Sequence, residues 1–386
     1  MRFFLLTLVL FVSTGIFANE PVATLPFKVH RGHMYIQGTI NGGREVNIVF
    51  DTGAAVNVAN SGLSEEIEFK SKFNTLANGA NGVVEMEFSK GNELRLGEDI
   101  LMKRQDFYLA DFSHLQDYDL PVDAIVGGTL LNEFVVEINF EKSIINLYPF
   151  NKYTKPTGYK VYPIDLQEFN IPMIEVTATV GEQESYSGRF LLDSGAGLAV
   201  SLNTPFVKEA SLLEKISPNY EYLGKALGNE SMEYVGSMNE LSFLDETLND
   251  IPTRMSTTIE GVSGHGQING LIGLEVLKRF QLVFNYKGSV MYAKKNDGFA
   301  KPFYENKHGL NIIKRKGYFL VIQVIPKSAG EVAKFKQGDQ IISVDGKKNL
   351  SHDDFESYVN SKKEVTLEVK RDGQLLELKL MPFSMI

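Results

Sequence analysis

Two short stretches of the chain share a pattern of apolar and polar positions. In each, an apolar run of strand type ends on an acidic residue, a hydroxyl residue, glycine and alanine: residues 48–54 read IVFDTGA and residues 190–196 read FLLDSGA. A buried carboxylate is costly unless it is paired or hydrogen-bonded. Two apolar strands that each deliver one Asp therefore predict two carboxylates that meet at one place.

The positions in front of each motif predict hairpins. Residues 35–40 and 45–50 alternate between apolar and polar and are joined by Asn-Gly-Gly, which is typical of a β-hairpin. The second unit repeats the arrangement with residues 174–180, a turn near Gly181, and residues 188–192. We expect two all-β lobes with one short helix each, connected by residues 149–158.

A second repeat follows each Asp motif. Residues 125–134 (IVGGTLLNEF) align without a gap with residues 271–280 (LIGLEVLKRF), and the match continues as 138–140 with 284–286 and 143–145 with 289–291. In the first copy, Leu130, Leu131 and Phe134 lie on one face of a predicted short helix. The separation between Asp motif and repeat is nearly equal in the two halves, which indicates duplication of a whole unit.

This double pattern resembles the aspartic peptidases, in particular the retropepsin-like branch with Asp-Thr/Ser-Gly-Ala. The resemblance implies a mainly β molecule of two lobes that form a pseudo-two-fold pair, each donating one catalytic Asp, here Asp51 and Asp193. A single chain would then hold a complete site, without dimerisation. By the same resemblance, the apolar-apolar-Gly strands at Val126-Gly127 and Ile272-Gly273 pass beside the two Asp loops.

The resemblance also assigns roles to the residues after each Asp. The hydroxyls of Thr52 and Ser194 brace the two loops against each other, and Gly53 and Gly195 permit close approach and supply backbone amides. Many pepsin-like members carry a hydroxyl donor where this chain has alanine, at Ala54 and Ala196. A donor to the ionised carboxylate lowers its pKa, so its absence predicts an activity optimum at weakly acidic or neutral pH.

Two facing carboxyl groups share one proton, and aspartic proteases are the standard example of this effect. One Asp acts as general base on a bound water, and the other, protonated, polarises the scissile carbonyl. The sequence does not say which Asp is the base. This chemistry requires neither a covalent intermediate nor a metal or other cofactor.

In the aspartic peptidases, a hairpin called the flap closes over the substrate between the Asp motif and the glycine strand. The glycine-rich segment at 78–82, followed by a strand at 83–88, is the candidate in the first lobe, and residues 224–229 occupy a similar place in the second. A glycine-rich loop between strands is often only a turn. The candidate flap residues are Asn78, Gly79, Gly82, Gly224 and Gly228.

The region after about residue 304 becomes lysine-rich and resembles a bacterial-type PDZ domain. Its short helix, Lys-x-Gly-Asp turn, apolar strand and Asp-Gly hairpin are matched within residues 326–346, and Ser351 and Asp354 are candidate caps of the next helix. A PDZ domain binds an extended peptide along a strand edge and holds its carboxyl end by backbone amides. The expected groove lies between residues 310–313 and the helix with Phe355 and Val359, and its loop residues are Gly309, Leu310, Asn311 and Ile312.

Two interpretations of this module remain open from the sequence. Asn311 stands where many PDZ domains have a second glycine, which puts capture of a free carboxylate in doubt. The module either binds a peptide, including a C-terminal peptide ligand, or braces the second lobe.

Composition narrows the function classes. The chain of 386 residues has no cysteine and a formal net charge of −9; the first excludes a thiol nucleophile and disulfides, and the second argues against nucleic-acid binding. Residues 1–18 have one charge, Arg2, and an apolar run, as in a secretory signal peptide. We expect cleavage, no stable membrane span afterwards, and a periplasmic or secreted bacterial protein.

The sequence thus predicts a signal peptide at 1–18, protease lobes at 19–150 and 159–295, and a PDZ domain at 304–386. The leading hypothesis is an exported aspartic endopeptidase that acts on peptides or unfolded proteins. The alternative is an inactive peptide-binding or scaffold protein that retains the fold. A serine protease is less favoured because the histidines are scattered along the chain. They also show no metal-ligand spacing: His30, His33, His114, His265, His308 and His352.

Overall fold

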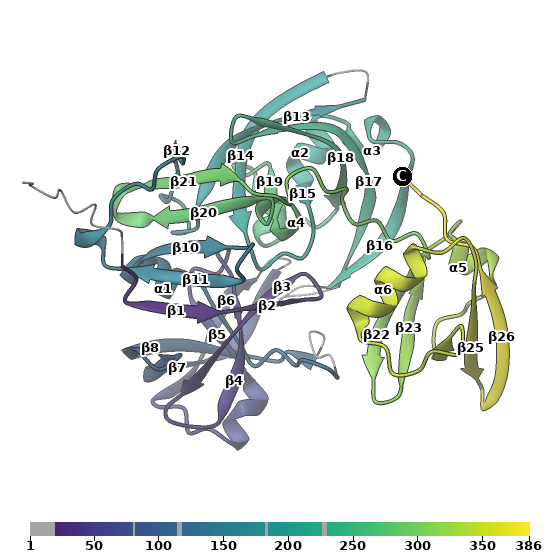
Figure 1. Ribbon diagram of the computed structural model, residues 1–386, viewed down its shortest axis with the longest axis horizontal. Coiled ribbons are helices and arrows are strands. Elements are labelled where there is room, and N and C mark those ends of the chain that lie inside the picture. Colours follow the sequence, from purple (N-terminus) through teal and green to yellow (C-terminus); the bar gives the residue numbers. More distant parts are fainter. Residues whose placement is uncertain (1–19, 80–81, 114–117, 182–183, 226–229) are drawn as a thin grey trace, which may run out of the picture.

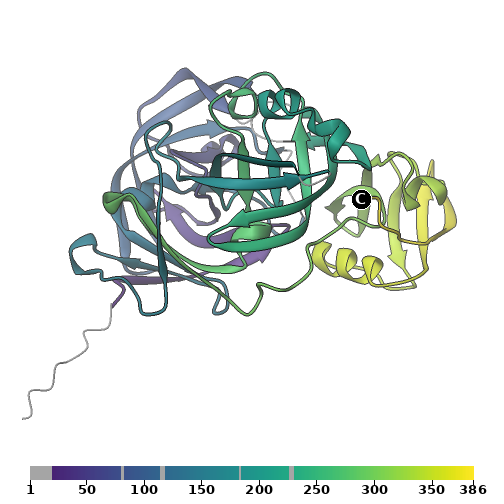
Figure 2. The same cartoon turned by 90° about the horizontal axis from the view of Figure 1, so that it is seen from above.

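The computed structural model describes residues 20–79, 82–113, 118–181, 184–225 and 230–386. Its strands form two lobes, a sheet that both lobes share, and a C-terminal domain (Figure 1). Seen from above, the C-terminal domain lies to one side of the paired lobes (Figure 2). The predicted signal peptide, residues 1–18, lies outside the described residues.

Lobe 1 is a closed barrel. Its strands run in the order β3-β4-β9-β5-β8-β7, and pairing of β7 with β3 closes the ring. Asn41 and Gly42 both have positive φ, which gives the β3–β4 hairpin the turn that its sequence predicts. The elements are β2 (Lys28–His30), β3 (His33–Ile40), β4 (Glu45–Phe50), β5 (Asn57–Asn60), η1 (Ser61–Glu65), β6 (Lys72–Gly79), β7 (Gly82–Leu96), β8 (Ile100–Ala110), β9 (Ala124–Val126) and α1 (Gly128–Glu133).

Lobe 2 repeats this topology strand for strand. The order β13-β14-β19-β15-β18-β17 closes through pairing of β17 with β13. The duplication inferred from the sequence is therefore a duplication of the whole barrel. The elements are β13 (Met173–Val180), β14 (Glu184–Asp193), β15 (Val200–Leu202), α2 (Thr204–Glu209), α3 (Leu212–Lys215), β16 (Asn219–Lys225), β17 (Glu230–Phe243), β18 (Glu246–Ser256), η4 (Val262–Gly264), β19 (Gly270–Gly273) and α4 (Leu274–Leu277).

The expectation of one short helix in each lobe is wrong for lobe 2, because α2 and α3 precede the hairpin β16–β17. A proline in the first turn favours the start of α2, and Phe206, Val207 and Leu212 bury their side chains against the barrel. Runs of four to six residues are too short for helical periodicity to identify them in the sequence.

A six-stranded sheet joins the lobes, in the order β1-β11-β10-β20-β21-β12. At its centre Val136 pairs with Phe284 and Ile138 with Leu282, so Glu137 and Val283 face each other. In the ungapped sequence repeat, positions 136, 137 and 138 correspond to 282, 283 and 284. The pseudo-two-fold axis therefore passes through the β10–β20 pair. The strands are β1 (Ala23–Pro26), β10 (Val135–Asn139), β11 (Ile144–Tyr148), β12 (Lys160–Pro163), β20 (Phe280–Asn285) and β21 (Val290–Lys295), with η3 (Phe150–Lys152) and η5 (Tyr286–Gly288) beside them.

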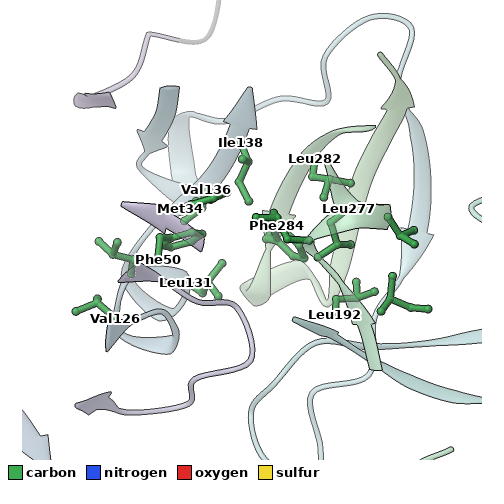
Figure 3. Close-up of a cluster of buried hydrophobic side chains, with 14 of the residues drawn as sticks. Met34, Phe50, Val126, Leu131, Val136, Ile138, Leu192, Leu277, Leu282 and Phe284 are labelled. Carbon is green, nitrogen blue, oxygen red and sulfur yellow. The ribbon is translucent and has the colours of Figure 1, made fainter. Parts of the chain in front are cut away.

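One hydrophobic core runs through both lobes and the shared sheet. Figure 3 shows Val136 and Ile138 of β10 facing Leu282 and Phe284 of β20 across the lobe boundary. The C-terminal domain has a core of its own, which includes Phe355. The two lobes therefore form one packed body, and the C-terminal domain forms a second.

The C-terminal domain is a five-stranded sheet in the order β22-β23-β24-β25-β26. Ser351 caps α6 by accepting a hydrogen bond from the Asp354 amide, as its sequence predicts, and Asp372-Gly373 forms the last hairpin turn with positive φ at both residues. The elements are β22 (Leu310–Arg315), β23 (Tyr318–Val324), α5 (Ala329–Val332), β24 (Gln340–Val344), α6 (His352–Asn360), β25 (Val365–Arg371) and β26 (Gln374–Leu380).

Candidate active site

Asp51 and Asp193 occupy equivalent places in the two barrels. β4 runs parallel to β9 and ends at Phe50, directly before Asp51, and β14 runs parallel to β19 and ends on Asp193 itself. The structure brings the two side chains within hydrogen-bonding distance of each other across the lobe boundary. Each residue is only partly exposed. Two carboxyl groups from separate strands therefore meet at one point.

A reciprocal set of hydrogen bonds locks the two Asp loops together. The Thr52 amide donates to Ser194 Oγ (3.0 Å), and the Ser194 amide donates to Thr52 Oγ1 (2.9 Å). Each hydroxyl then donates to the strand of the opposite lobe, Thr52 to the Leu192 carbonyl (2.7 Å) and Ser194 to the Phe50 carbonyl (3.1 Å). Both hydroxyl residues are fully buried. This is the bracing role that the sequence resemblance implies.

Glycine is required after each hydroxyl because the opposite carboxylate lies directly against it. A Cβ on Gly53 would lie 2.7 Å from Cγ of Asp193, and a Cβ on Gly195 would lie 2.2 Å from Cγ of Asp51. Both distances are shorter than a Cβ contact allows. Each glycine thus makes room for the Asp of the other lobe.

Backbone amides surround the carboxyl groups unequally. Gly53 donates to Asp51 Oδ1 (2.7 Å), and Asp51 also receives a backbone hydrogen bond from Gly195. In contrast, Gly195 and Ala196 both donate to the same oxygen of Asp193, Oδ1 (2.9 Å each). Two donors on one oxygen stabilise an ionised carboxylate. The geometry therefore favours a proton on Asp51 and a negative charge on Asp193.

Burial and proximity raise the pKa of both carboxyl groups. Burial raises the pKa of Asp51 well above its ordinary value, and the charge of Asp193 and the hydrogen bond between the two groups raise it further, while the backbone amides of Gly53 and Gly195 oppose the rise. Burial also raises the pKa of Asp193, while the hydrogen bond from Asp51 and the two amides oppose that rise. The pair can therefore keep one shared proton at a pH where isolated Asp residues are ionised.

The apolar-apolar-Gly strands lie beside the Asp loops. A Cβ on Gly127 would lie 1.6 Å from the Asp51 carbonyl oxygen, and a Cβ on Gly273 would lie 2.2 Å from the Leu198 carbonyl oxygen. The amide of Gly128 donates to the Ala54 carbonyl (2.7 Å), and that of Leu274 donates to the Ala196 carbonyl (2.8 Å). The two lobes support their Asp loops in the same way.

Comparison with known families gives two matches. Residues 36–130 match the aspartyl protease family, and residues 308–381 match the PDZ domain. Lobe 1 is thus similar to an aspartyl protease domain, and the C-terminal domain to a PDZ domain. The resemblance drawn from the Asp motifs and from the C-terminal sequence is thereby confirmed, and lobe 2 repeats the protease topology outside the matched range.

A solved structure of an aspartic proteinase from Irpex lacteus is similar to this chain at 10% sequence identity and a TM-score of 0.45. The similarity covers 72% of this chain and 98% of that one. No curated protein matches the chain.

Both candidate flaps of the protease lobes are hairpins in the structure. β6 and β7 pair from Lys72–Ser89 to Gly79–Gly82, so Asn78, Gly79 and Gly82 lie at the end of the first hairpin. β16 and β17 pair up to Lys225–Glu230, which places Gly224 near the end of the second. Gly228 lies outside the described residues. In each lobe the outer strand of the hairpin pairs only with its partner and stands outside the closed barrel.

The predicted peptide loop of the PDZ domain uses its amides internally. The Gly309 amide donates to Asn306 Oδ1 (2.8 Å), and the Leu310 amide donates to His308 Nδ1 (3.1 Å). Leu310 and Ile312 are buried, at 1% and 2% exposure, and Asn311 Nδ2 donates to the Tyr222 hydroxyl of lobe 2 (3.4 Å).

The expected groove is also filled by its own walls. Phe355 and Val359 of α6 are fully buried and belong to the same core as Leu310 and Ile312. All four side chains are closed off from solvent within this core, so none of them is exposed to line an open groove.

Sequence reasoning assigned no role to two histidines, His30 and His33. His30 is 2% exposed, and its Nδ1 lies 3.4 Å from Asp353 Oδ2 of the PDZ domain. The ring of His33 forms a hydrogen bond with the backbone of Gly195, beside the dyad. The repeat could not reveal them, because lobe 2 has only a single antiparallel bridge, Asp165 with Met173, where lobe 1 has the β2–β3 pairing and its short turn.

Within the described part of the chain, no group of three or more His, Cys, Asp or Glu residues could hold a metal ion. The same residues contain no helix that is long and apolar enough to span a membrane.

Proposed function

We propose that the protein is an exported aspartic endopeptidase that hydrolyses peptide bonds with a water held between Asp51 and Asp193. The single observation that supports this most directly is the contact of the two carboxyl groups inside a reciprocally hydrogen-bonded pair of loops. Two acids in contact carry a desolvation penalty that apolar residues at the same positions would not have. A purely structural role therefore does not explain why acids are present. Catalysis gives a reason for their presence.

The amide pattern suggests the roles of the two acids. Asp193, with two amides on Oδ1, acts as general base and draws a proton from the water. Asp51 carries the shared proton and transfers it to the oxygen of the scissile carbonyl as the water attacks, so that a neutral tetrahedral diol forms. The C–N bond of the diol then breaks, Asp193 gives its proton to the departing amine, and a hydroxyl of the diol returns a proton to Asp51.

We propose peptides and unfolded proteins as substrates. In each flap hairpin the outer strand pairs only with its partner and is not part of the closed barrel, as suits closure over an extended chain. The internal bonding of Gly309 and Leu310 favours a positioning role for the PDZ domain over capture of a free carboxyl terminus.

Cleavage of casein, followed by mass spectrometry of the products, tests the proposal. We expect Asp51→Asn and Asp193→Asn each to lower kcat at least about 100-fold, the low end for loss of a general acid or base. Pepstatin should inhibit the parent. Asp99→Asn, in an exposed turn, is the matched control and should retain full activity. Equal cleavage by the parent and both dyad variants would show that the site is wrong; absence of cleavage in the parent would favour the scaffold alternative.

The proposal includes export to the periplasm or beyond, which is based on residues 1–18 alone. The intact mass of the protein recovered from an expressing bacterium should correspond to a chain that begins near Asn19. A mass that retains residues 1–18 would contradict cleavage.

A further inference from the structure

Hydrogen bonds and ion pairs join the PDZ domain to the protease lobes in three regions of the described chain. Asp353 of α6 accepts a hydrogen bond from the Arg31 amide (3.4 Å to Oδ1), in the turn between β2 and β3. Lys314 of β22 forms an ion pair with Asp119 of lobe 1 (2.8 Å). The third region is β16, the outer strand of the second flap, where the Leu223 amide donates to Gln323 Oε1 (3.2 Å) and the Tyr222 hydroxyl accepts from Asn311 Nδ2 (3.4 Å).

The first of these contacts holds a strained turn. Arg31 and Gly32 both have positive φ, 49° and 74°. The left-handed conformation is unfavourable for a residue with a Cβ, by roughly 1–2 kcal/mol, so Arg31 needs support from its surroundings. Asp353 provides it through the Arg31 amide and through the neighbouring His30 ring.

The same turn lies against the catalytic loop of lobe 2. A Cβ on Gly32 would lie 2.6 Å from Cα of Gly197, so the two backbones touch across the lobe boundary. The next residue, His33, is hydrogen-bonded to the backbone of Gly195, whose amide donates to the Asp193 carboxylate. A continuous path of contacts therefore leads from α6 of the PDZ domain to the dyad.

His33 is suited to keep one hydrogen bond in this series of contacts. Burial, and then the charge of Arg31, lower the pKa of His33 to about 4. The ring is therefore neutral at the weakly acidic or neutral pH expected for activity. It can hold one tautomer and one hydrogen bond to Gly195 without bringing a positive charge beside Asp193.

We propose that Asp353 and His33 are positioning residues of the active site: the docked PDZ domain holds the β2–β3 turn against the Asp193 loop and thereby sets the geometry of the dyad. This inference rests on the proposed endopeptidase function. Misplacement of a reacting group by about 1 Å can cost as much as 100-fold in rate, so a contact at the far end of the path can affect the chemical step. The competing interpretation is a brace that stabilises the lobes and leaves the catalytic loop unaffected.

Asp353→Ala in the full chain separates the two interpretations. Asp353 is half exposed, with 52% of its side chain accessible, so the variant should fold. We expect kcat to fall about tenfold, with KM changed less than about twofold, because the turn acts on the dyad and not on substrate binding. Amide hydrogen exchange should become faster both in the turn at 31–33 and in the loop at 194–198.

Two further variants complete the test. Asp353→Asn keeps an oxygen that accepts from the Arg31 amide and should restore most of kcat and of the protection from exchange. Glu377→Ala removes an exposed acid from β26, on the opposite edge of the PDZ sheet, and should match the parent in every measurement.

The exchange measurement keeps this inference distinct from the proposed function. If Asp353→Ala leaves kcat and exchange at 194–198 as in the parent, the positioning role is wrong. If the dyad variants show that the protein does not cleave through Asp51 and Asp193, faster exchange at 194–198 would still support the coupling, and unchanged exchange would overturn it.

Discussion

At the scale of single residues, the site depends on contacts that residues of each lobe make with residues of the other. Gly53 accommodates Asp193, Gly195 accommodates Asp51, and the two hydroxyl residues after the acids hydrogen-bond across the same boundary. The Asp loop of each lobe therefore needs the loop of the other lobe to complete its contacts. The asymmetry is small and lies in the amides, since Ala196 donates to the carboxylate of its own loop, while Ala54 donates to the Asp51 carbonyl (3.2 Å).

The residue scale carries a prediction about pH. The raised pKa of both acids should place the maximum of kcat/KM at weakly acidic or neutral pH. Ala196→Ser would add a hydroxyl donor beside Asp193, which favours the ionised form and lowers its pKa. We expect the acidic limb of the pH–rate profile to move to lower pH by about one unit. A parent profile that peaks below about pH 3 would contradict the prediction, as would an acidic limb that serine does not move.

At the scale of elements, β9 and β19 decide where the Asp loops can lie. Each passes so close to its loop that only glycine fits at the crossing, at Gly127 and Gly273. The helix that follows is then hydrogen-bonded to the loop through its first residues, Gly128 and Leu274. The repeated sequence after each Asp motif is thus the support of that motif.

Gly127→Ala tests this support. The new Cβ would overlap the Asp51 carbonyl, so strand or loop must move, and overpacking of this kind costs about 1–3 kcal/mol or more. We expect the free energy of unfolding in urea to fall by at least about 2 kcal/mol, together with a loss of activity. Gly266→Ala is the control, because nothing lies within 4 Å of its Cβ position; it should change stability by less than about 0.5 kcal/mol. Equal stability of the two variants would show that β9 does not pass as close to the Asp51 carbonyl as the contact at Gly127 indicates.

At the scale of the whole molecule, two cores divide the chain. One runs through both lobes and the shared sheet, and the other belongs to the PDZ domain. The PDZ domain also buries an acid, Glu356, whose Oε2 lies 2.8 Å from His308 Nε2. Burial raises the pKa of Glu356, but the charge and hydrogen bond of His308, with His352 and Tyr304, outweigh it and lower the value to about 2.

This organisation predicts two thermal transitions, with Glu356→Gln affecting only that of the PDZ domain. The pKa of Glu356 is lower in the folded state than in the unfolded chain. Its contribution to the free energy of unfolding is therefore fully present when the pH is above the ordinary pKa of Glu, and it is lost as the pH falls toward 2. We expect the variant to lose about 2–3 kcal/mol at neutral pH, a shift of roughly 10 °C in that transition. In calorimetry from pH 7 to pH 3, the difference in the PDZ transition temperature between the parent and Glu356→Gln should become smaller. Glu377→Gln should resemble the parent at every pH. A single transition that shifts as a whole would contradict the division.

Much of this arrangement follows from local pattern. The hairpin at Asn41-Gly42, the cap at Ser351 and the two Asp motifs depend on residues a few positions apart, and such signals can be read along the chain. The short helices α2 and α3 give no such signal. The buried environment of His30 and the burial of Phe355 and Leu310 in one core depend on residues far away in sequence, and they could not be predicted.

The sequence by itself determined that there are two equivalent units, that each presents one acid after an apolar strand, and that a PDZ domain follows. These are properties of short segments, where alternation, turn residues and repetition act within a few residues. Tertiary structure decided the pairing of β10 with β20, the amides that distinguish Asp193 from Asp51, and the contact of α6 with the β2–β3 turn. Each depends on which surfaces meet when separate units pack, and the free energy of that packing is distributed over residues that no local pattern connects.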